Sequence, residues 1–318
     1  MTSPNFRKHL YASALLLLIG SAAHATTLYV NCGARGASGA FTSIGAALKG
    51  LQSSESHGSA IINVTGACSE NIVIQSLDRL TLNALNGASV SDASGGRRDV
   101  ISIQDSRDVA INGFAINAGS DGASGANGIV CGDFSTCRLS VNVIQGAGSG
   151  AGFAVYSQAQ ATVDGDTFQN NGNGLIVNSG SKVRSAGDQA RPIIARGNRT
   201  GISTSRQGLV YVTAVVDNNS SRGALVQFNS TLEIFGGSIS HNGSVGAEVR
   251  EGSVARFTYG TAITNNDGPG VLIHDLSMVT FDATVTGNAG GTDVVCNPQY
   301  SATRGVADTG GTTNCVEP

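Results

Sequence analysis

The sequence predicts an all-β protein whose chain coils as a parallel β-helix with three sheets, with a short capping helix near the N-terminus. Between residues 223 and 270 one pattern occurs twice, as three short alternating segments separated by Gly, Asn and Ser. A glycine that opens a strand also recurs every 21 to 27 residues, at Gly128, Gly152, Gly174, Gly201, Gly223, Gly246, Gly270 and Gly291. A unit of this length cannot bury its own apolar face, so successive units must stack.

Residues 1–25 are typical of a cleaved secretory signal. Arg7 and Lys8 precede an apolar run from Leu10 to Ile19, and small residues lead to Ala25, where we expect cleavage. The alternative is an uncleaved membrane anchor, but the apolar run is shorter than the roughly 20 residues that a spanning helix needs. We therefore expect a protein secreted to the periplasm or the extracellular space, with no membrane span after cleavage.

The composition excludes several classes of partner. The formal net charge is −3, and loss of Arg7 and Lys8 with the signal makes it two units more negative. No basic run follows, which argues against nucleic acid and against an anionic membrane surface. No cofactor motif is present, and we expect a monomer.

Six cysteines in an exported chain favour disulfides. Six thiols allow 15 connectivities, and the sequence does not choose among them. We expect nearest-neighbour pairs, Cys32 with Cys68, Cys131 with Cys137, and Cys296 with Cys315. Metal ligation is the alternative, but no C-x-x-C pair or close Cys/His cluster supports it, so we expect no metal site.

Residues 26–60 precede the repeat and are expected to cap it. A strand is predicted at Leu28–Asn31, and Phe41–Leu48, followed by Leu51, spaces its apolar residues at the helical period. The helix would cover the open apolar end of the first coil, although a partner-binding helix is the alternative. Residues 61–296 form the β-helix, and residues 297–318 form a Gly/Thr-rich C-terminal tail.

Within the repeat, apolar residues alternate with polar ones at the period of a strand. The inward side chains predicted after the glycines include Leu175 and Val177, Ala224 and Val226, and Ala247 and Val249; a second inward set includes Val210 and Val212, and Leu232 and Ile234. Thr204 is an unusual residue for such a buried position. An Asn precedes most of the glycines, at Asn171, Asn198, Asn219, Asn242, Asn266 and Asn288. We expect these Asn residues to adopt left-handed turn conformations and to stack as a hydrogen-bonded ladder.

This pattern resembles the right-handed parallel β-helix repeat proteins of the pectin-lyase-like superfamily. The residues that carry the resemblance are the Phe41–Leu48 cap, the Asn-x-x-Gly or Asn-x-x-x-Gly turns and the alternating triplets after them, over residues 27 to 296. The resemblance is specific for the fold and not for the function, because the superfamily includes lyases, hydrolases, esterases, epimerases, tailspikes and adhesins.

The catalytic motifs of these relatives are absent. Gly66–Glu70 has Cys68 where the esterase relatives have Tyr, and the polygalacturonase strings do not occur. Asp164-Gly-Asp166 is the nearest approach to the acidic calcium cage of pectate lyases, and a turn is the alternative that we favour. The neighbours His274 and Asp275 are expected to point to opposite faces of a strand and to form no catalytic relay.

One outward column could bind a ligand. Stacking of the coils aligns Thr162, Arg184, Tyr211, Glu233, Arg256 and Thr280 on the solvent side of one sheet. Arg184, Tyr211, Glu233 and Arg256 could contact the carboxylates and hydroxyls of a sugar chain. The alternative is an ordinary polar surface in which Glu233 and Arg256 are cross-strand partners.

Three functions stay open from the sequence. The first is a secreted β-helix that binds extracellular polysaccharide without catalysis. The second is a polysaccharide lyase or glycoside hydrolase with an unfamiliar active site on this face, and the third is a structural surface protein without glycan affinity. Whether the protein is an enzyme is undecided at this stage.

Overall fold

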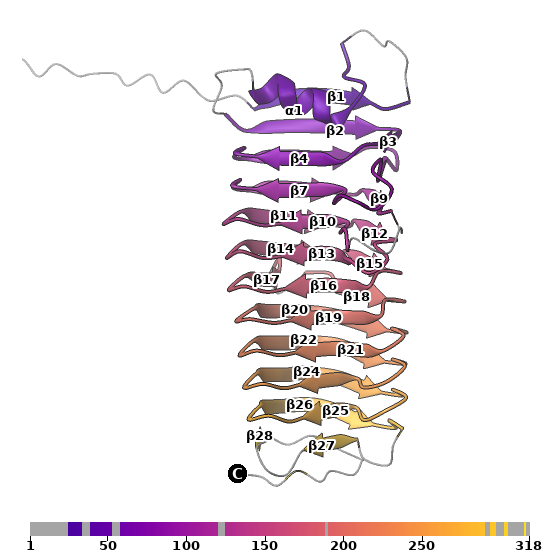
Figure 1. The fold of residues 1–318 in the computed structure, drawn as a ribbon, viewed down its shortest axis with the longest axis vertical. Coiled ribbons are helices and arrows are strands. Elements are labelled where there is room, and N and C mark those ends of the chain that lie inside the picture. Colours follow the sequence, from indigo (N-terminus) through magenta and orange to yellow (C-terminus); the bar gives the residue numbers. More distant parts are fainter. Residues whose placement is uncertain are drawn as a thin grey trace, which may run out of the picture.

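The protein is a right-handed parallel β-helix in which successive coils are stacked along the long axis of the molecule (Figure 1). A computed structural model describes residues 25–33, 39–52, 58–119, 125–187, 190–289, 293–296, 302–304 and 315. Nearly all of the predicted secretory signal, and Gly291, lie outside these residues. The predicted class is confirmed.

Each coil contributes one strand to each of three walls, which we name A, B and C. In the first coils, wall A consists of β1 (Thr26–Asn31), β2 (Ala60–Thr65), β5 (Leu80–Ala84), β8 (Val109–Asn112), β11 (Thr136–Ser140), β14 (Gln160–Asp164) and β17 (Lys182–Ser185). Wall B consists of β3 (Ala67–Ser69), β6 (Ser89–Ser91), β9 (Ala115–Asn117), β12 (Val143–Gln145), β15 (Thr167–Gln169) and β18 (Ile193–Arg196).

Walls A and B merge in the later coils, because four long strands run through both. These are β20 (Leu209–Asp217), β22 (Thr231–Ser240), β24 (Val254–Thr264) and β26 (Met278–Thr286). A register shift within each pairing of these strands marks the corner that they pass, for example between Val212 and Ala214. β28 (Ala302–Arg304) pairs with β26 and extends wall A by one strand.

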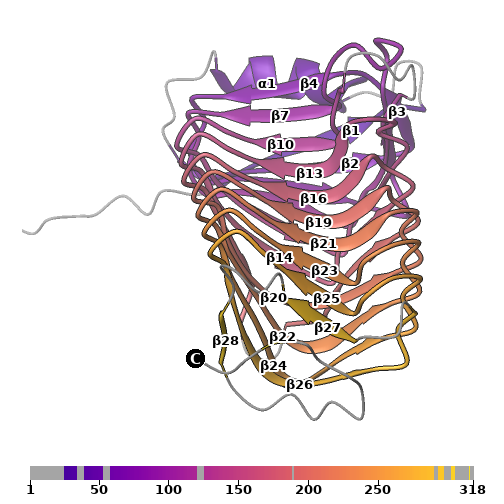
Figure 2. The ribbon, with the colours of Figure 1, turned by 60° about the horizontal axis from the view of Figure 1, so that its bottom comes forward.

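Wall C is a separate sheet of ten strands. They are β4 (Ile72–Gln75), β7 (Ile101–Gln104), β10 (Ile129–Cys131), β13 (Ala151–Val155), β16 (Asn173–Val177), β19 (Thr200–Thr204), β21 (Arg222–Val226), β23 (Ala247–Val249), β25 (Val271–Ile273) and β27 (Val294–Cys296). Neighbouring strands pair in parallel in all three walls. Figure 2, tilted toward the C-terminal end, shows wall C and the long strands on different sides of the same coils.

The core is a single apolar column inside the coils. The predicted inward residues Leu175, Val177, Leu232 and Ile234 are all fully buried. Thr204, the polar residue predicted at an inward position, is also fully buried, and its Oγ1 makes no hydrogen bond in the described part of the chain. Burial of side chains along the whole stack is the main stabilising contribution.

The repeating glycine has a steric cause. A Cβ at Gly223 would lie 2.5 Å from the carbonyl oxygen of Gly246 in the next coil and 2.7 Å from Nδ2 of Asn242. Such distances are far inside van der Waals contact, so a side chain would force the coils apart. Close packing of coils at this column therefore fixes the phase of the repeat.

The predicted asparagine ladder is present and buried. The side chain of Asn219 donates to Asn242 Oδ1 at 2.9 Å, and Asn242 donates to Asn266 Oδ1 at 2.8 Å. The left-handed conformation is found one residue earlier than expected, for example at Asn218 and His241, whereas the ladder residues themselves have negative φ. The reason is that the side chain of the ladder residue must point inward, and the residue directly before it makes the turn that orients it.

A serine ladder, which the sequence reasoning missed, lines the turn from wall C to wall A. The amide of Ser230 donates to Ser253 Oγ, and that of Ser253 donates to Ser277 Oγ, both at 3.1 Å. Ser106 and Ser135 repeat the arrangement at the N-terminal end. Each buried backbone donor at this turn thus gains an acceptor.

The N-terminal end is closed by α1 (Ile44–Gln52), which begins three residues later than the predicted Phe41. Phe41 instead makes a strand-like bridge with Val30, and Ser43 Oγ accepts the amide of Ala46 at the start of the helix. Ile44, Ala47 and Leu48 are buried against the first coil. No helix in the described ranges is long and apolar enough to cross a bilayer.

Three disulfides join Cys32 to Cys68, Cys131 to Cys137, and Cys296 to Cys315. The first ties β1 to β3 at the N-terminal end, and the second closes a short loop between walls C and A. The third fixes Cys315 to the last strand of wall C. The pairing is that of nearest neighbours along the chain.

Candidate functional site

The outward column predicted from the sequence lies on wall A in continuous register. Thr162 pairs with Arg184, Arg184 with Tyr211, and Tyr211 with Glu233. Glu233 pairs with Arg256. Strands in a sheet are about 4.8 Å apart, so successive side chains of the column are one strand spacing apart.

The N-terminal half of this column lies in a groove formed by two adjoining hollows of about 480 and 670 Å³. We call it the wall A groove. The hollows share Asp108, Arg138, Thr162 and Ala186. The first continues toward the capped end as far as Arg79 and Ser59, and the second reaches Lys182, Arg184 and Tyr211.

The groove is basic, although the chain as a whole is acidic. Its lining has four basic side chains, Arg79, Arg138, Lys182 and Arg184, and two acidic ones, Asp108 and Asp164. Lining a hollow with one dominant sign of charge raises the local concentration of ligands of the other sign. The sequence predicted only Arg184 of these four.

Both acids of the groove are already engaged by arginine. Arg138 donates to Asp108, and Nη2 of Arg191 lies 2.6 Å from Oδ2 of Asp164. The hydrogen bond from Arg191 holds the pKa of the Asp164 carboxyl below its usual value. In contrast, Lys182 and Arg184 have no carboxylate partner in the described part of the chain, and both side chains are exposed.

Tyr211 provides an aromatic surface at the C-terminal end of the groove. Its ring stacks on Phe235, with 4.3 Å between the ring centroids, and 40% of Tyr211 is exposed. Stacking fixes the ring while one face stays accessible. A ring held in this way can pack against the C–H face of a sugar.

Glu233 and Arg256 continue the column but do not line the wall A groove. Arg256 Nη1 and Glu233 Oε2 are 3.9 Å apart, so the two side chains form the cross-strand pair that was the alternative interpretation. The structure therefore brings Arg184 and Tyr211 together with Lys182 and Arg138. It leaves Glu233 and Arg256 as partners of each other.

The Asp164-Gly-Asp166 sequence is a turn with two different acids. Gly165 has a φ of 68°, and the side chain of Asp166 is fully buried beneath the corner between walls A and B. Asp166 accepts hydrogen bonds from the amide and the side chain of Asn142, at 2.9 and 2.8 Å. Burial raises the pKa of Asp166 to about 6. The two carboxylates serve separate hydrogen-bond networks.

The expectation that His274 and Asp275 point to opposite faces is wrong. β25 ends at Ile273, and Asp275 has a φ of 55°, so the pair lies in a turn where strand alternation no longer applies. Nδ1 of His274 is 2.8 Å from Asp275, and Nε2 is 3.3 Å from Oε1 of Glu248. Glu248, almost fully buried on wall C, also pairs with Arg222 and Arg250. Each charge in this cluster therefore has a partner within it.

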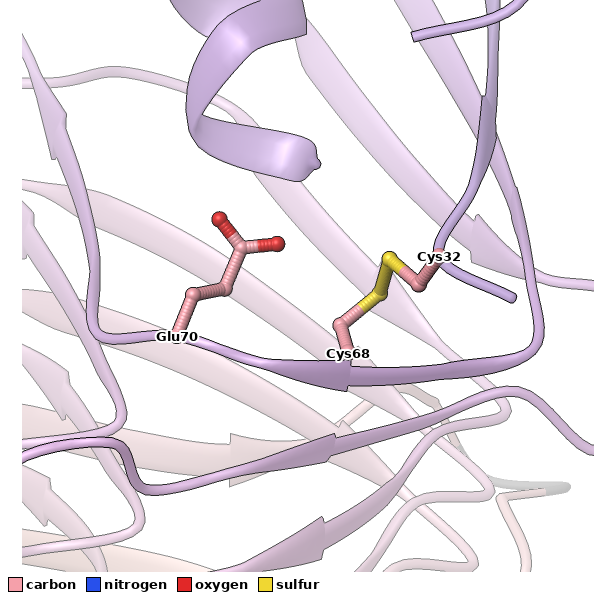
Figure 3. A group of neighbouring side chains, drawn as sticks. All are labelled: Cys32, Cys68 and Glu70. Carbon is pink, nitrogen blue, oxygen red and sulfur yellow. A yellow bond between two sulfur atoms is a disulfide. The ribbon is translucent and has the colours of Figure 1, made fainter. Parts of the chain in front are cut away.

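Cys32, Cys68 and Glu70 also lie close together, at the N-terminal end (Figure 3). The two sulfur atoms are bonded to each other, and both oxygens of Glu70 accept helix amides, from Ile44 at 2.8 Å and Gly45 at 2.9 Å. A carboxylate at a helix N-terminus is stabilised by the free amides and the helix dipole. The group therefore has a structural role as a helix cap.

Comparisons with known proteins place the fold. No family model matches the chain, and no curated protein matches it. Among solved structures, the A-module of the mannuronan C-5 epimerase AlgE4 from Azotobacter vinelandii is similar with a TM-score of 0.60 and 14% identity, over 91% of this chain and 98% of that one. The A-module of AlgE6 from the same organism gives 0.59 and 14%, over 86% and 91%. A double mutant of the periplasmic alginate epimerase AlgG gives 0.58 and 11%, over 83% and 75%.

Proposed function

Because this chain is a parallel β-helix protein with the pectin-lyase-like fold, we propose that it binds an acidic extracellular polysaccharide in the wall A groove, without catalysis. The observation that carries the proposal is the pair Lys182 and Arg184, two exposed cations without carboxylate partners in the described chain, inside a continuous groove. Two such cations side by side on one strand can form charge-assisted hydrogen bonds to the carboxylates of an acidic polymer that crosses the strand.

The polymer lies along the stack of strands. Lys182 and Arg184 come from one strand and receive carboxylates, while Tyr211 on the next strand packs against a sugar ring. Charge-assisted hydrogen bonds fix the register of the chain, and stacking on the tyrosine adds apolar contact. The similarity to epimerase modules supports a polysaccharide ligand only as an analogy of fold.

Secretion is part of the same proposal. Three disulfides are typical of proteins that fold in an oxidising compartment, and the N-terminal 25 residues have the pattern of an export signal. An acidic polysaccharide of a cell surface or matrix would then be directly accessible. Analysis of the exported protein by N-terminal sequencing should find a chain that begins at Thr26.

The test is binding to alginate, polygalacturonate and deacylated gellan, measured by affinity electrophoresis and calorimetry. We expect the variant Lys182→Gln/Arg184→Gln to lose at least about tenfold in affinity, since a hydrogen bond to a charged group contributes about 1.5–3 kcal/mol. The loss should shrink at high salt, where the charges are screened. Arg199→Gln is the matched control, because Arg199 is exposed in the turn between walls B and C.

The same samples decide between the alternatives. New absorbance from unsaturated ends, or new reducing ends, formed by the wild type and lost in Lys182→Gln/Arg184→Gln, would replace binding by lyase or hydrolase activity. Failure of the wild type to bind any of the three polymers would leave a structural surface protein.

A further inference from the structure

The edge where wall C turns into wall A has a notch. From β10 onward the coils turn at this edge through two successive residues with positive φ, including Ser157–Gln158, Ser179–Gly180, Arg206–Gln207 and Phe228–Asn229. Backbone hydrogen bonds stack these turns directly on one another. Gly180 thus lies between Gln158 and Gln207 in one column, and the missing side chain interrupts the ridge.

The notch is open space. A Cβ added at Gly180 would meet only Cγ of Gln158, at 3.6 Å, which is an ordinary contact. The hollow around it has a volume of about 760 Å³ and is also lined by Arg206, Phe228 and Asn229. Space for a side chain exists here, and the sequence leaves it unfilled.

The notch is continuous with the wall A groove. Gln160 and Lys182 line both hollows, so the two spaces meet at the edge of wall A. The groove runs across the strands of wall A, whereas the notch leaves it sideways toward wall C. A linear polymer that follows the stack of strands passes the junction without entering the notch.

The lining of the notch suits a sugar residue. The side chains of Gln158, Gln207 and Asn229 make no hydrogen bond within the described chain, so their amides are available to hydroxyl groups. Arg206 likewise has no ion-pair partner there, and Phe228 is 45% exposed at the wall of the notch. Amide donors and acceptors beside an aromatic face are the elements that recognise the polar rim and the C–H face of a pyranose.

We propose that the notch is a subsite for a single sugar residue that branches from the acidic main chain in the wall A groove. This inference rests on the proposed function and adds that the preferred ligand is a branched acidic polysaccharide. Lys182 at the junction contacts the main chain, and Arg206, Gln207 and Phe228 contact the branch. The main chain alone would leave the notch filled with water.

The test compares two polymers that share a main chain. Deacylated gellan is an unbranched polymer that contains glucuronate, and welan has the same main chain with one-sugar branches. We expect the full-length protein to bind welan at least about tenfold more tightly than gellan. The variant Gly180→Gln should abolish this preference and leave the affinity for gellan unchanged.

Gln is chosen to replace Gly180 because both adjacent coils already have Gln at this turn position. Gln158 and Gln207 occupy the same turn position in the adjacent coils with φ values of 61° and 64°, so the backbone accepts Gln there. Gly260→Gln is the matched control, because Gly260 also has a positive φ and an open surrounding but lies away from the notch. The Phe228→Ala variant removes a contact with the branch without filling the notch, and the preference for welan over gellan is measured again in this variant.

Each result has a defined meaning. Equal affinity of the wild type for gellan and welan, or tighter binding of gellan, overturns the branch subsite but not the groove. An equal loss of affinity for gellan and welan in Gly180→Gln also overturns the branch subsite, since the notch would then bind the main chain. If the wild type binds neither of this pair, the branch subsite fails, and the proposed function fails as well if alginate and polygalacturonate are not bound.

Discussion

Removal of one buried asparagine should destabilise the whole stack. Asn242 is fully buried, and its side chain joins three coils: Oδ1 accepts from the amide and side chain of Asn219 at 3.1 and 2.9 Å, and Nδ2 donates to Asn266 at 2.8 Å. The variant Asn242→Ala deletes these bonds and leaves the backbone amide of Asn219 buried without an acceptor, while Nδ2 of Asn219 keeps its bond to the carbonyl of Ala195 at 3.0 Å. An unsatisfied buried amide costs about 1–3 kcal/mol and each of the two other lost hydrogen bonds about 0.5–1.5 kcal/mol, so we expect a loss of about 3–5 kcal/mol in unfolding free energy.

Chemical denaturation followed by circular dichroism, supported by calorimetry, measures this loss. Asn83→Ala is the matched control, because Asn83 belongs to a stack with Asn63 and Asn112 on the outer, solvent-facing side of wall A. Water can replace its bonds, so we expect a loss below about 1 kcal/mol. Similar losses for both variants would refute the view that burial, and not stacking itself, makes the inner ladder stabilising.

Two further predictions concern buried or capping acids. Burial raises the pKa of Asp166 from 3.8 to about 6, so the folded protein binds this proton more tightly than the unfolded chain does, and protonation of Asp166 stabilises the fold. This stabilisation is nearly complete at pH 3 and is lost as the pH rises through 6, so the stability advantage of wild type over Asp166→Asn should fall by about 3 kcal/mol between pH 3 and pH 7 in denaturation curves. A pH-independent difference would contradict the assignment. The Glu70→Ala variant loses both helix-cap hydrogen bonds of α1 and should lower the unfolding free energy by about 1–2 kcal/mol, with earlier loss of hydrogen-exchange protection in residues 44–52 than in Glu70→Gln, which retains one acceptor. Equal protection in the two variants would show that the carboxylate does not cap the helix.

The repeat made the fold predictable because the same physical constraint acts in every coil. Gly223 is required by contact with Gly246, and Val226 and Leu232 are required by the core, so the spacing of these residues reports the stacking directly. The register of Arg184 and Tyr211 followed from that spacing without further information. The wrong predictions concern the ends of elements, because the period of a helix or a strand does not show where that element begins or stops. Helix α1 begins at Ile44, and His274 lies in the turn after β25.

The groove itself was not predictable from the spacing. Its depth depends on small residues such as Ala186 beside larger neighbours, and its charge depends on which arginines are neutralised. Arg138 and Arg191 are paired with acids, whereas Arg184 is not. A signal for Lys182 was present, since it is the outward residue two positions before Arg184 on the same strand.

The serine ladder had a readable signal as well. Ser230, Ser253 and Ser277 each precede the first inward residue of a wall A strand by two positions. A search for periodic polar residues, in addition to apolar ones, would have found it. Buried polar groups in a solenoid repeat as regularly as the core does, since each one must be satisfied by the next coil.

The merging of walls A and B in the later coils divides the molecule into two regions with different tolerance for added residues. Up to β18 the chain leaves wall A at every corner before it enters wall B, and Ala186, which directly follows β17 at such a corner, lines the groove. From β20 onward the strand passes the corner without interruption. Lengthened corners can therefore overhang the groove and change its shape, while an insertion at the same place in β22 or β24 would break the hydrogen-bonded ladder itself.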